Sequence, residues 1–409
     1  MSLTIFRYHL SCYKIALLLC LTVSMATFSL AQQPADAERT QALKMLWEES
    51  RPEDALPLLE KLAKSRPDDG IVMFSYGFAL LGHAKLLKDA DARKQTRIDA
   101  RNSMIKAQDL GVKEPLLKSV LEGLSADGGK DDVFSDNKIA DDAMRDGEIA
   151  YVHGDFRSAA AAYQRALEAD PKLYEAALFA GDMSFKLDLN NKAAEWYARA
   201  VQINPDRETA YRYSATPFLK QGKLEEARQR YIEAVIAEPY NRLTWSGLGQ
   251  WADAAGVTLA HPRVEIPTSV TPLKDGNMTI KLDPKLTDDK DGSGLGSWIF
   301  YGIHRSAWAM SKFAEVYPKE KTYRHSLREE FEALSGVVEA VKQRQKDKKI
   351  KELDASLTNL VKLSDEGLLE PFILFALADA GISRDYDGYR KENRDKLRRY
   401  LVQYVTAGK

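Results

Sequence analysis

Three prolines, Pro171, Pro205 and Pro239, stand 34 residues apart in the middle of the chain. The same residue types recur before each one: an alanine five residues earlier, a tyrosine eight earlier and a second alanine twelve earlier. These positions hold Ala159, Tyr163 and Ala166, then Ala193, Tyr197 and Ala200, then Ala227, Tyr231 and Ala234. A fixed period of this length is typical of repeat architectures, in which one supersecondary unit packs on the next. The pattern predicts three copies of one helical hairpin.

The residue types fit two helices packed closely together. Alanine allows close approach of a helix to its partner, tyrosine fills the gap to the next unit, and proline ends the second helix. Small residues also stand where each first helix would cross its partner, at Gly147, Gly181 and Ala215. The pattern resembles the tetratricopeptide-repeat family, clearly over residues 141–256 and in degenerate form over residues 38–124. Residues 297–409 resemble no recognised family.

The resemblance implies an all-α fold, a tetratricopeptide-repeat superhelix (α-solenoid), followed by an extended connector and a further helical region. We expect degenerate helical repeats over 38–124, a loop near 125–137, and three repeats with a capping helix over 138–256. Residues 257–296 contain Pro262, Pro267, Pro272 and Pro284, and read as an extended connector with a small hairpin around 275–277. Helical patterns return at 297–316, 321–346, 349–363, 366–380 and 385–406.

Residues 1–31 have the features of a signal peptide. Arg7 and Lys14 precede an apolar run that ends in small residues, and cleavage is expected before Gln32. The alternative is an uncleaved anchor, although the run is short for a spanning helix. Both cysteines, Cys12 and Cys20, lie in this segment, so the mature chain would contain none and would rely on packing alone. We expect export to the periplasm or outside the cell, possible association with a bacterial envelope, and no transmembrane helix in the mature chain.

Composition restricts the class of partner. The 409 residues carry a formal net charge of -1, so no bulk attraction for nucleic acid is expected. The basic run at 390–399 is interleaved with Tyr389, Leu397 and Tyr400. It is best explained by an amphipathic C-terminal helix, and a membrane surface or an acidic partner is the alternative.

No motif for catalysis, a cofactor or a metal is found, and the prediction is a protein that is not an enzyme. A calcium loop at 287–294 is disfavoured because the EF-hand frame would require Thr287 and Trp298 as acidic ligands. The alternative is an envelope enzyme with its site after residue 297. A cleft that pairs His304 or His325 with a carboxylate would favour this alternative.

We therefore predict a protein-interaction scaffold or adaptor that binds a polypeptide on its concave face. The family's first helices line that face, and its contact positions fall here on Met144, Glu148, Tyr151, Leu178, Asp182, Phe185, Arg212, Thr216 and Leu219. A carboxylate clamp is disfavoured, because Met144, Phe179 and Tyr213 stand at or near its positions. Two alternatives are a groove filled by the chain's own C-terminal segment and a purely structural subunit of an envelope assembly. The partner's identity and the oligomeric state are left open.

Overall fold

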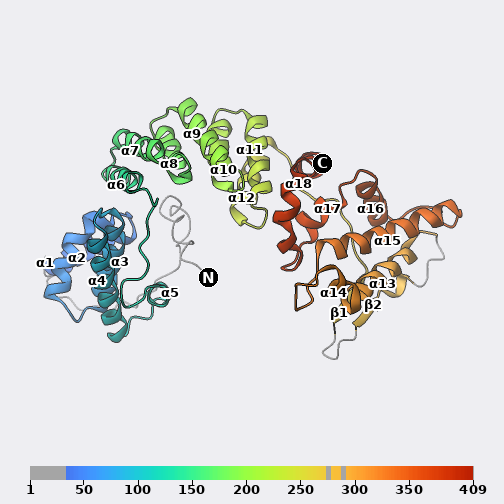
Figure 1. Ribbon diagram of the computed structural model, residues 1–409, viewed down its shortest axis with the longest axis horizontal. Helices are drawn as coiled ribbons and strands as arrows, with labels where there is room; N and C mark the ends of the chain where they lie inside the picture. The colour runs from blue at the N-terminus through green and yellow to red at the C-terminus, as the bar shows by residue number, and fades with distance from the viewer. Residues whose placement is uncertain (1–33, 273–277, 287–291, 409) are drawn as a thin grey trace, which may run out of the picture. The chain divides into compact units, whose positions relative to one another are not determined.

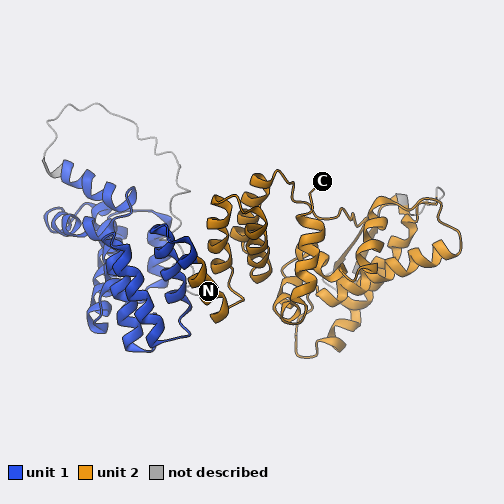
Figure 2. Ribbon diagram, turned by 90° about the horizontal axis from the view of Figure 1, so that it is seen from above, with its two compact units in different colours: residues 1–193 blue, residues 194–409 orange. Residues whose placement is uncertain are grey.

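A computed structural model describes residues 34–272, 278–286 and 292–408. The expected signal peptide and most of the disfavoured calcium loop lie outside these residues. The chain forms two compact units, residues 1–193 and 194–409 (Figure 2), and the division falls within helix α9 (Asn190–Ile203). Both units are built mainly from helices, which confirms the all-α prediction. The finer division into five segments stays a prediction.

Unit 1 is a succession of helical hairpins (Figure 1). Its helices are α1 (Pro34–Trp47), α2 (Pro52–Ser65), α3 (Gly70–Leu86), α4 (Ala90–Asp109), α5 (Pro115–Gly123), α6 (Lys138–Val152), α7 (Phe156–Ala169) and α8 (Tyr174–Lys186). Several begin at side-chain caps, and Asp89, Asn137 and Asp155 each accept a hydrogen bond from a backbone N–H of the first turn. These caps set the start of each helix locally.

The segment between α5 and α6 has no helix, and arginines of α4 fasten it. The guanidinium groups of Arg93 and Arg97 donate hydrogen bonds to Asp131, at 2.5 and 2.9 Å. Arg97 and Arg101 also donate to the carbonyls of Gly128 and Leu124. The predicted loop is therefore an ordered strap along α4.

After the remainder of α9, unit 2 contains the third repeat and the capping helix. These are α10 (Glu208–Lys220), α11 (Leu224–Ala237) and α12 (Arg242–Ala255). Gly256 ends α12 with a left-handed backbone, φ 66°, a conformation that glycine adopts without steric cost. Strands β1 (Thr268–Pro272) and β2 (Met278–Leu282) follow as an antiparallel pair with Val270 opposite Ile280. The predicted hairpin is confirmed, and its turn lies outside the described residues.

The rest of unit 2 is helical, as predicted. Its elements are α13 (Ile299–Ala307), the π-helical turn η4 (Trp308–Lys312), α14 (Phe313–Val316), α15 (Leu327–Lys346), α16 (Ala355–Asp365), α17 (Leu369–Phe372), the π-helical turn η5 (Ile373–Leu377), α18 (Tyr386–Tyr400) and the π-helical turn η7 (Leu401–Val405). The predicted first residues of two helices, 321 and 349, are wrong. These helices begin at Leu327 and Ala355, because their N-cap residues lie further along the chain. Ser326 accepts from the Glu329 N–H at 3.2 Å, and Asp354 accepts from the Ser356 N–H at 2.8 Å.

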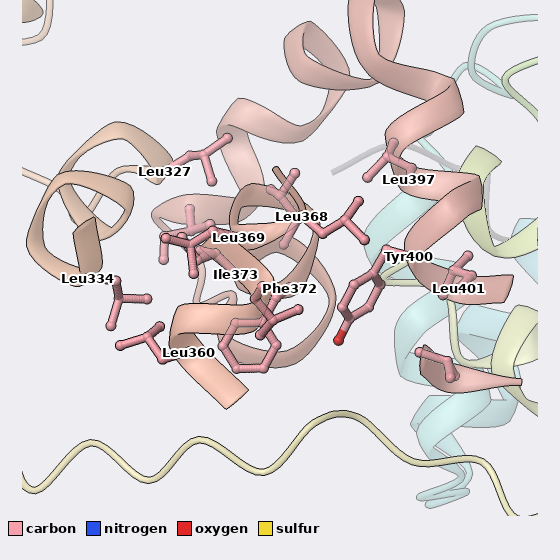
Figure 3. Packing of buried hydrophobic residues seen from close by; sticks show 14 of the residues in the cluster. Leu327, Leu334, Leu360, Leu368, Leu369, Phe372, Ile373, Leu397, Tyr400 and Leu401 are labelled. Carbon is pink, nitrogen blue, oxygen red and sulfur yellow. The ribbon is translucent and has the colours of Figure 1, made fainter. Parts of the chain in front are cut away.

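One hydrophobic core joins the third repeat to the C-terminal region of unit 2. It includes Tyr231 and Val235 of α11, Trp251 of α12, and residues of α15 to η7. Figure 3 shows its C-terminal part, where Phe372 lies between the labelled leucines of α15 and α16 on one side and Tyr400 and Leu401 on the other. The C-terminal helices therefore pack directly on the repeat. Among the described residues, no helix is both long enough and apolar enough to cross a membrane.

Candidate functional site

In unit 1 three of the predicted contact residues, Glu148, Tyr151 and Asp182, interact electrostatically with one buried tyrosine. The ring of Tyr163, from α7, is 1% exposed and makes an edge-to-face contact with Phe179 of α8, with 5.5 Å between centroids. Its hydroxyl donates a hydrogen bond to Glu148 of α6 at 2.8 Å. Burial raises the pKa of Tyr163, and the charges of Glu148 and Asp182 raise it further. The structure thus brings carboxylates of α6 and α8 near one hydroxyl.

A lysine lies over two aromatic rings of the same repeat region. The ammonium of Lys186, at the end of α8, lies 5.6 Å from the ring centroid of Tyr151 and 5.2 Å from that of Phe156. The two rings lie 6.1 Å apart. A cation over an aromatic face is attracted by the ring quadrupole. Lys186 and Phe156 are not among the predicted contact residues, although Lys186 directly follows the predicted Phe185.

The nine predicted residues differ in exposure. Met144 is 0% exposed and Leu178 is 2% exposed, so both belong to the core, because each faces neighbouring helices. Glu148, Tyr151, Asp182 and Phe185 are partly exposed. We refer to Glu148, Tyr151, Asp182, Phe185 and Lys186 as the first-helix surface of unit 1. Burial raises the pKa of Glu148, and the Tyr163 hydroxyl opposes this shift.

The three predicted residues of unit 2 lie on α10 and are all partly buried. Arg212 makes a bidentate ion pair with Glu208, at 2.7 and 3.0 Å, and its guanidinium lies 4.8 Å from the ring centroid of Tyr213. Leu219 packs against the main core of the unit. Thr216 forms a hydrogen bond with Tyr231. Burial raises the pKa of Tyr231, and the hydrogen bond to Thr216 partly opposes this shift. The side chains of Arg212, Thr216 and Leu219 therefore contact other residues of unit 2.

The basic C-terminal helix lies on the second helix of the third repeat. Tyr386 of α18 donates to the carbonyl of Ile236 at 2.7 Å, and Arg390 donates to the carbonyl of Ala237. Arg394 and Arg398 both pair with Glu233, at 3.1 and 2.5 Å. Glu233 is therefore an acidic partner of the basic run within the same chain. The carbonyls at the end of α11, which have no partner inside the helix, accept hydrogen bonds from α18.

A second polar cluster lies among the C-terminal helices. Arg305 of α13 pairs with Glu329 and Glu330 of α15, at 2.7 and 3.1 Å. Tyr301 donates to Glu330 at 2.9 Å and Tyr323 donates to Glu329 at 2.7 Å. Both glutamates are buried. Burial of two carboxylates requires this number of partners.

His325 connects this cluster to another segment. Its Nε2 lies 2.9 Å from Glu330, and its Nδ1 lies 2.9 Å from Asp379. Burial by itself would lower the pKa of His325, but its two carboxylate partners raise it above the usual value. The predicted helical setting of Arg324 and His325 is wrong, because both precede the cap Ser326. The pairing of His325 with a carboxylate is the arrangement that the enzyme alternative requires, but here it belongs to a closed set of ion pairs.

Unit 1 contains an open cavity of about 490 Å³. It is bounded by residues 133–137 and by Ala169, Asp170, Lys172 and Leu173. Ser135 donates to Asp170 at 2.6 Å, so two of the lining side chains already bind each other. Over the part of the chain that the structure describes, no three His, Cys, Asp or Glu side chains form a group suited to a metal ion.

Comparison with known proteins identifies the repeats. Residues 145–208 match the family model for the tetratricopeptide repeat. The chain therefore carries tetratricopeptide repeats, a fold that generally serves protein interaction. No curated protein matches the chain.

Solved structures are also similar to parts of the chain. The first tetratricopeptide domain of Spaghetti, bound to an HSP90 peptide, is 23% identical, with 30% of this chain and 99% of that chain covered and a TM-score of 0.28. PilF of Pseudomonas aeruginosa is 14% identical, with 54% and 84% covered and a TM-score of 0.27. A repeat protein of Thermus thermophilus is 16% identical, with 55% and 100% covered and a TM-score of 0.24.

Proposed function

We propose that this chain is an exported adaptor that binds a polypeptide segment of another envelope protein on the first-helix surface of unit 1. The observation that carries the proposal is the cluster around Tyr163. Glu148 and Tyr151 of α6 and Asp182 of α8 interact with this one side chain. Ordered aromatic and charged side chains on adjacent helices suit recognition, because they bury apolar area and orient a few polar contacts.

The chemistry of this surface favours a mixed apolar and polar segment. Tyr151 and Phe185 supply aromatic rings, and Glu148 and Asp182 supply acceptors. A helix in a groove meets such a surface with apolar anchors three and four residues apart. A carboxylate clamp is disfavoured, because Met144 at one of its positions is an apolar side chain in the core.

Export is supported by the sequence alone. Arg7 and Lys14, the apolar run and the small residues at 29 and 31 have the order of a signal peptide. Amino-terminal sequencing of the protein purified from cells tests this part of the proposal. A first residue of Gln32 in a periplasmic or secreted fraction supports it, and an intact Met1 in the cytoplasm contradicts it.

Site-specific photo-crosslinking in living cells tests the binding surface. A photoreactive phenylalanine analogue replaces Tyr151, and in a matched variant it replaces Gln164, an exposed residue on the outer side of α7. We expect one discrete crosslinked protein at position 151 that is absent at position 164. Its yield should fall when Asp182→Lys is added to the same chain. Equal crosslinking at both positions, or none at 151, would contradict the proposal.

A second candidate, an acid–base enzyme, is favoured only by the position of His325 between Glu330 and Asp379. An accessible imidazole is needed for proton transfer to a substrate. Here both ring nitrogens already lie 2.9 Å from carboxylates, and we propose that the cluster is structural.

A further inference from the structure

The first-helix surface of unit 1 contains a carboxylate that pairs with no cation of the chain. Helix α6 carries four acidic side chains, and three of them form an ion pair with a lysine or arginine of the same unit. Those pairs are Asp141 with Arg145 at 2.9 Å, Asp142 with Lys138 at 2.7 Å and Asp146 with Lys88 at 2.6 Å. The fourth, Glu148, accepts a hydrogen bond from the Tyr163 hydroxyl at 2.8 Å, and no lysine or arginine among the described residues forms an ion pair with it.

Two cations lie near Glu148 without binding it. Lys85 of α3 and Arg145 lower its pKa through their charge alone, and Tyr163 lowers it through the hydrogen bond. The guanidinium of Arg145 is bound instead to Asp141 and to two backbone carbonyls. Burial outweighs these effects and raises the pKa of Glu148. The ionised carboxylate therefore lacks both full hydration and a bound cation, and a cation from a partner would stabilise it.

Glu148 lies where a partner can reach it. Its side chain is partly exposed, and Tyr151 follows one helical turn later on the same face of α6. Asp182 of α8 lies nearby, because its charge and that of Glu148 both act on the Tyr163 hydroxyl. A basic side chain suits this position, because its charged end can pair with a carboxylate while its apolar stem lies along the helices. An acidic segment would be repelled.

We infer that the polypeptide segment bound on this surface carries an arginine or lysine whose cationic group pairs with Glu148. The inference rests on the proposed function, since it names the chemistry of the partner at the same surface. The cation at the end of α8, Lys186, lies over the rings of Tyr151 and Phe156 and does not act on the pKa of Glu148. Glu148 is thus the residue that selects a basic side chain in the partner.

Photo-crosslinking from position 151 tests this pairing, because that position lies one turn from Glu148. We expect Glu148→Gln to lower the yield of the crosslinked protein at least tenfold, the effect of losing a hydrogen bond between charged groups. The amide oxygen of glutamine can still accept from Tyr163, so the fold should be kept, and circular dichroism of the purified variant checks it. Asp146→Asn is the matched control. It removes a charge from the same helix, but one that is already paired with Lys88, and the yield should stay within about twofold of wild type.

Mass spectrometry of the crosslinked protein locates the bound segment and allows a second test. We expect a lysine or arginine within about seven residues, two helical turns, of the crosslinked position. Replacing it by glutamine should lower the yield as Glu148→Gln does. The two changes together should cost no more than either one, because both remove the same contact.

The outcomes separate this inference from the proposed function. A crosslink at position 151 whose yield is unchanged in Glu148→Gln, a segment without a basic residue in that range, or losses that add in the double variant would overturn the pairing and leave the binding surface in place. The absence of any crosslink from position 151 would overturn both.

Discussion

The ring of Tyr163 lies directly against the backbone of Gly147. A Cβ atom built on the glycine would lie 2.3 Å from Cε1 of the tyrosine. The glycine belongs to α6 and the tyrosine to α7, so their contact sets the distance between the two helices of the first repeat. The hydroxyl of the same tyrosine reaches Glu148 at 2.8 Å. One packing contact thus closes the hairpin and orients a carboxylate of the first-helix surface.

We predict that Gly147→Ala destabilises the protein by about 1–3 kcal/mol, because the added methyl group overpacks the contact. Alanine has the higher helix propensity, by about 1 kcal/mol, which opposes this loss. Urea unfolding followed by circular dichroism measures the difference. Gly249→Ala in α12 is the control, since no atom lies within 4 Å of a Cβ built there, and its stability should be equal or higher. An equally stable Gly147→Ala variant would contradict the tight contact.

The 34-residue period predicts contacts of this kind because they are local. Gly147 and Tyr163 are 16 positions apart, within one repeat, and their residue types recur in the other copies. The tyrosine of the third repeat also packs against a glycine, but that glycine lies in the following helix: a Cβ on Gly247 of α12 would lie 2.7 Å from Tyr231. The repeated spacing therefore predicts the helix pairs and the tyrosines that join them, and not every residue that these tyrosines contact.

Contacts between distant segments could not be predicted. The pairing of His325 with Asp379 spans 54 positions, and that of Arg398 with Glu233 spans 165. No periodicity marks either pair. Exposure at the candidate site also depends on neighbours, since Met144 and Leu178 hold contact positions of the family but are covered here. The sequence therefore located the candidate surface and did not determine which of its residues are accessible.

We predict that Tyr386→Phe lowers the free energy of unfolding by about 1–2 kcal/mol, because the variant leaves the carbonyl of Ile236 without its donor. Tyr386 is buried, and its hydroxyl donates to that carbonyl at 2.7 Å. Tyr240→Phe is the control, because its longer bond of 3.2 Å to Leu374 comes from an exposed side chain, and the cost should be smaller. Thermal unfolding of both variants measures this, and equal losses would contradict the importance of the α18 contact.

The strap along α4 should be sensitive to acid. The guanidinium of Arg93 holds the pKa of Asp131 at about 2, below its usual 3.8. A carboxylate whose pKa is lowered by folding stabilises the fold fully above its pKa in the unfolded state, and this stabilisation is lost as the pH falls through its pKa in the folded state. The difference between the two pKa values of Asp131 corresponds to about 2 kcal/mol. Asp131→Asn should be less stable than wild type at pH 6 and nearly equal to it at pH 2.

Unfolding of both proteins by urea between pH 2 and pH 6 measures this convergence. Asp127→Asn is the control, because its carboxylate lies in the same strap but bonds only within it, to Ser125 and the Gly129 N–H. The free energy of unfolding of Asp127→Asn should stay closer to that of wild type at every pH between 2 and 6. A constant difference between Asp131→Asn and wild type across this range would show that ionisation of Asp131 does not stabilise the fold.

His325 should give the opposite dependence on pH. Glu330 of α15 and Asp379 raise its pKa, while burial and Arg305 of α13 oppose them. A raised pKa contributes stability that is complete below the unfolded value of about 6.5 and is lost as the pH rises through the folded value. The free energy of unfolding of the wild type should therefore exceed that of His325→Gln by about 1–3 kcal/mol at pH 6. This is the contribution of a hydrogen bond between charged groups. The difference in free energy of unfolding should narrow above the raised pKa, because a neutral ring donates only one hydrogen bond and leaves one carboxylate facing a lone pair.

Urea unfolding at a series of pH values measures this difference. His153→Gln, at an exposed position, is the control, and its difference from wild type should not change with pH. If the free energies of wild type and His325→Gln change in parallel with pH, protonation of His325 does not hold the two segments together.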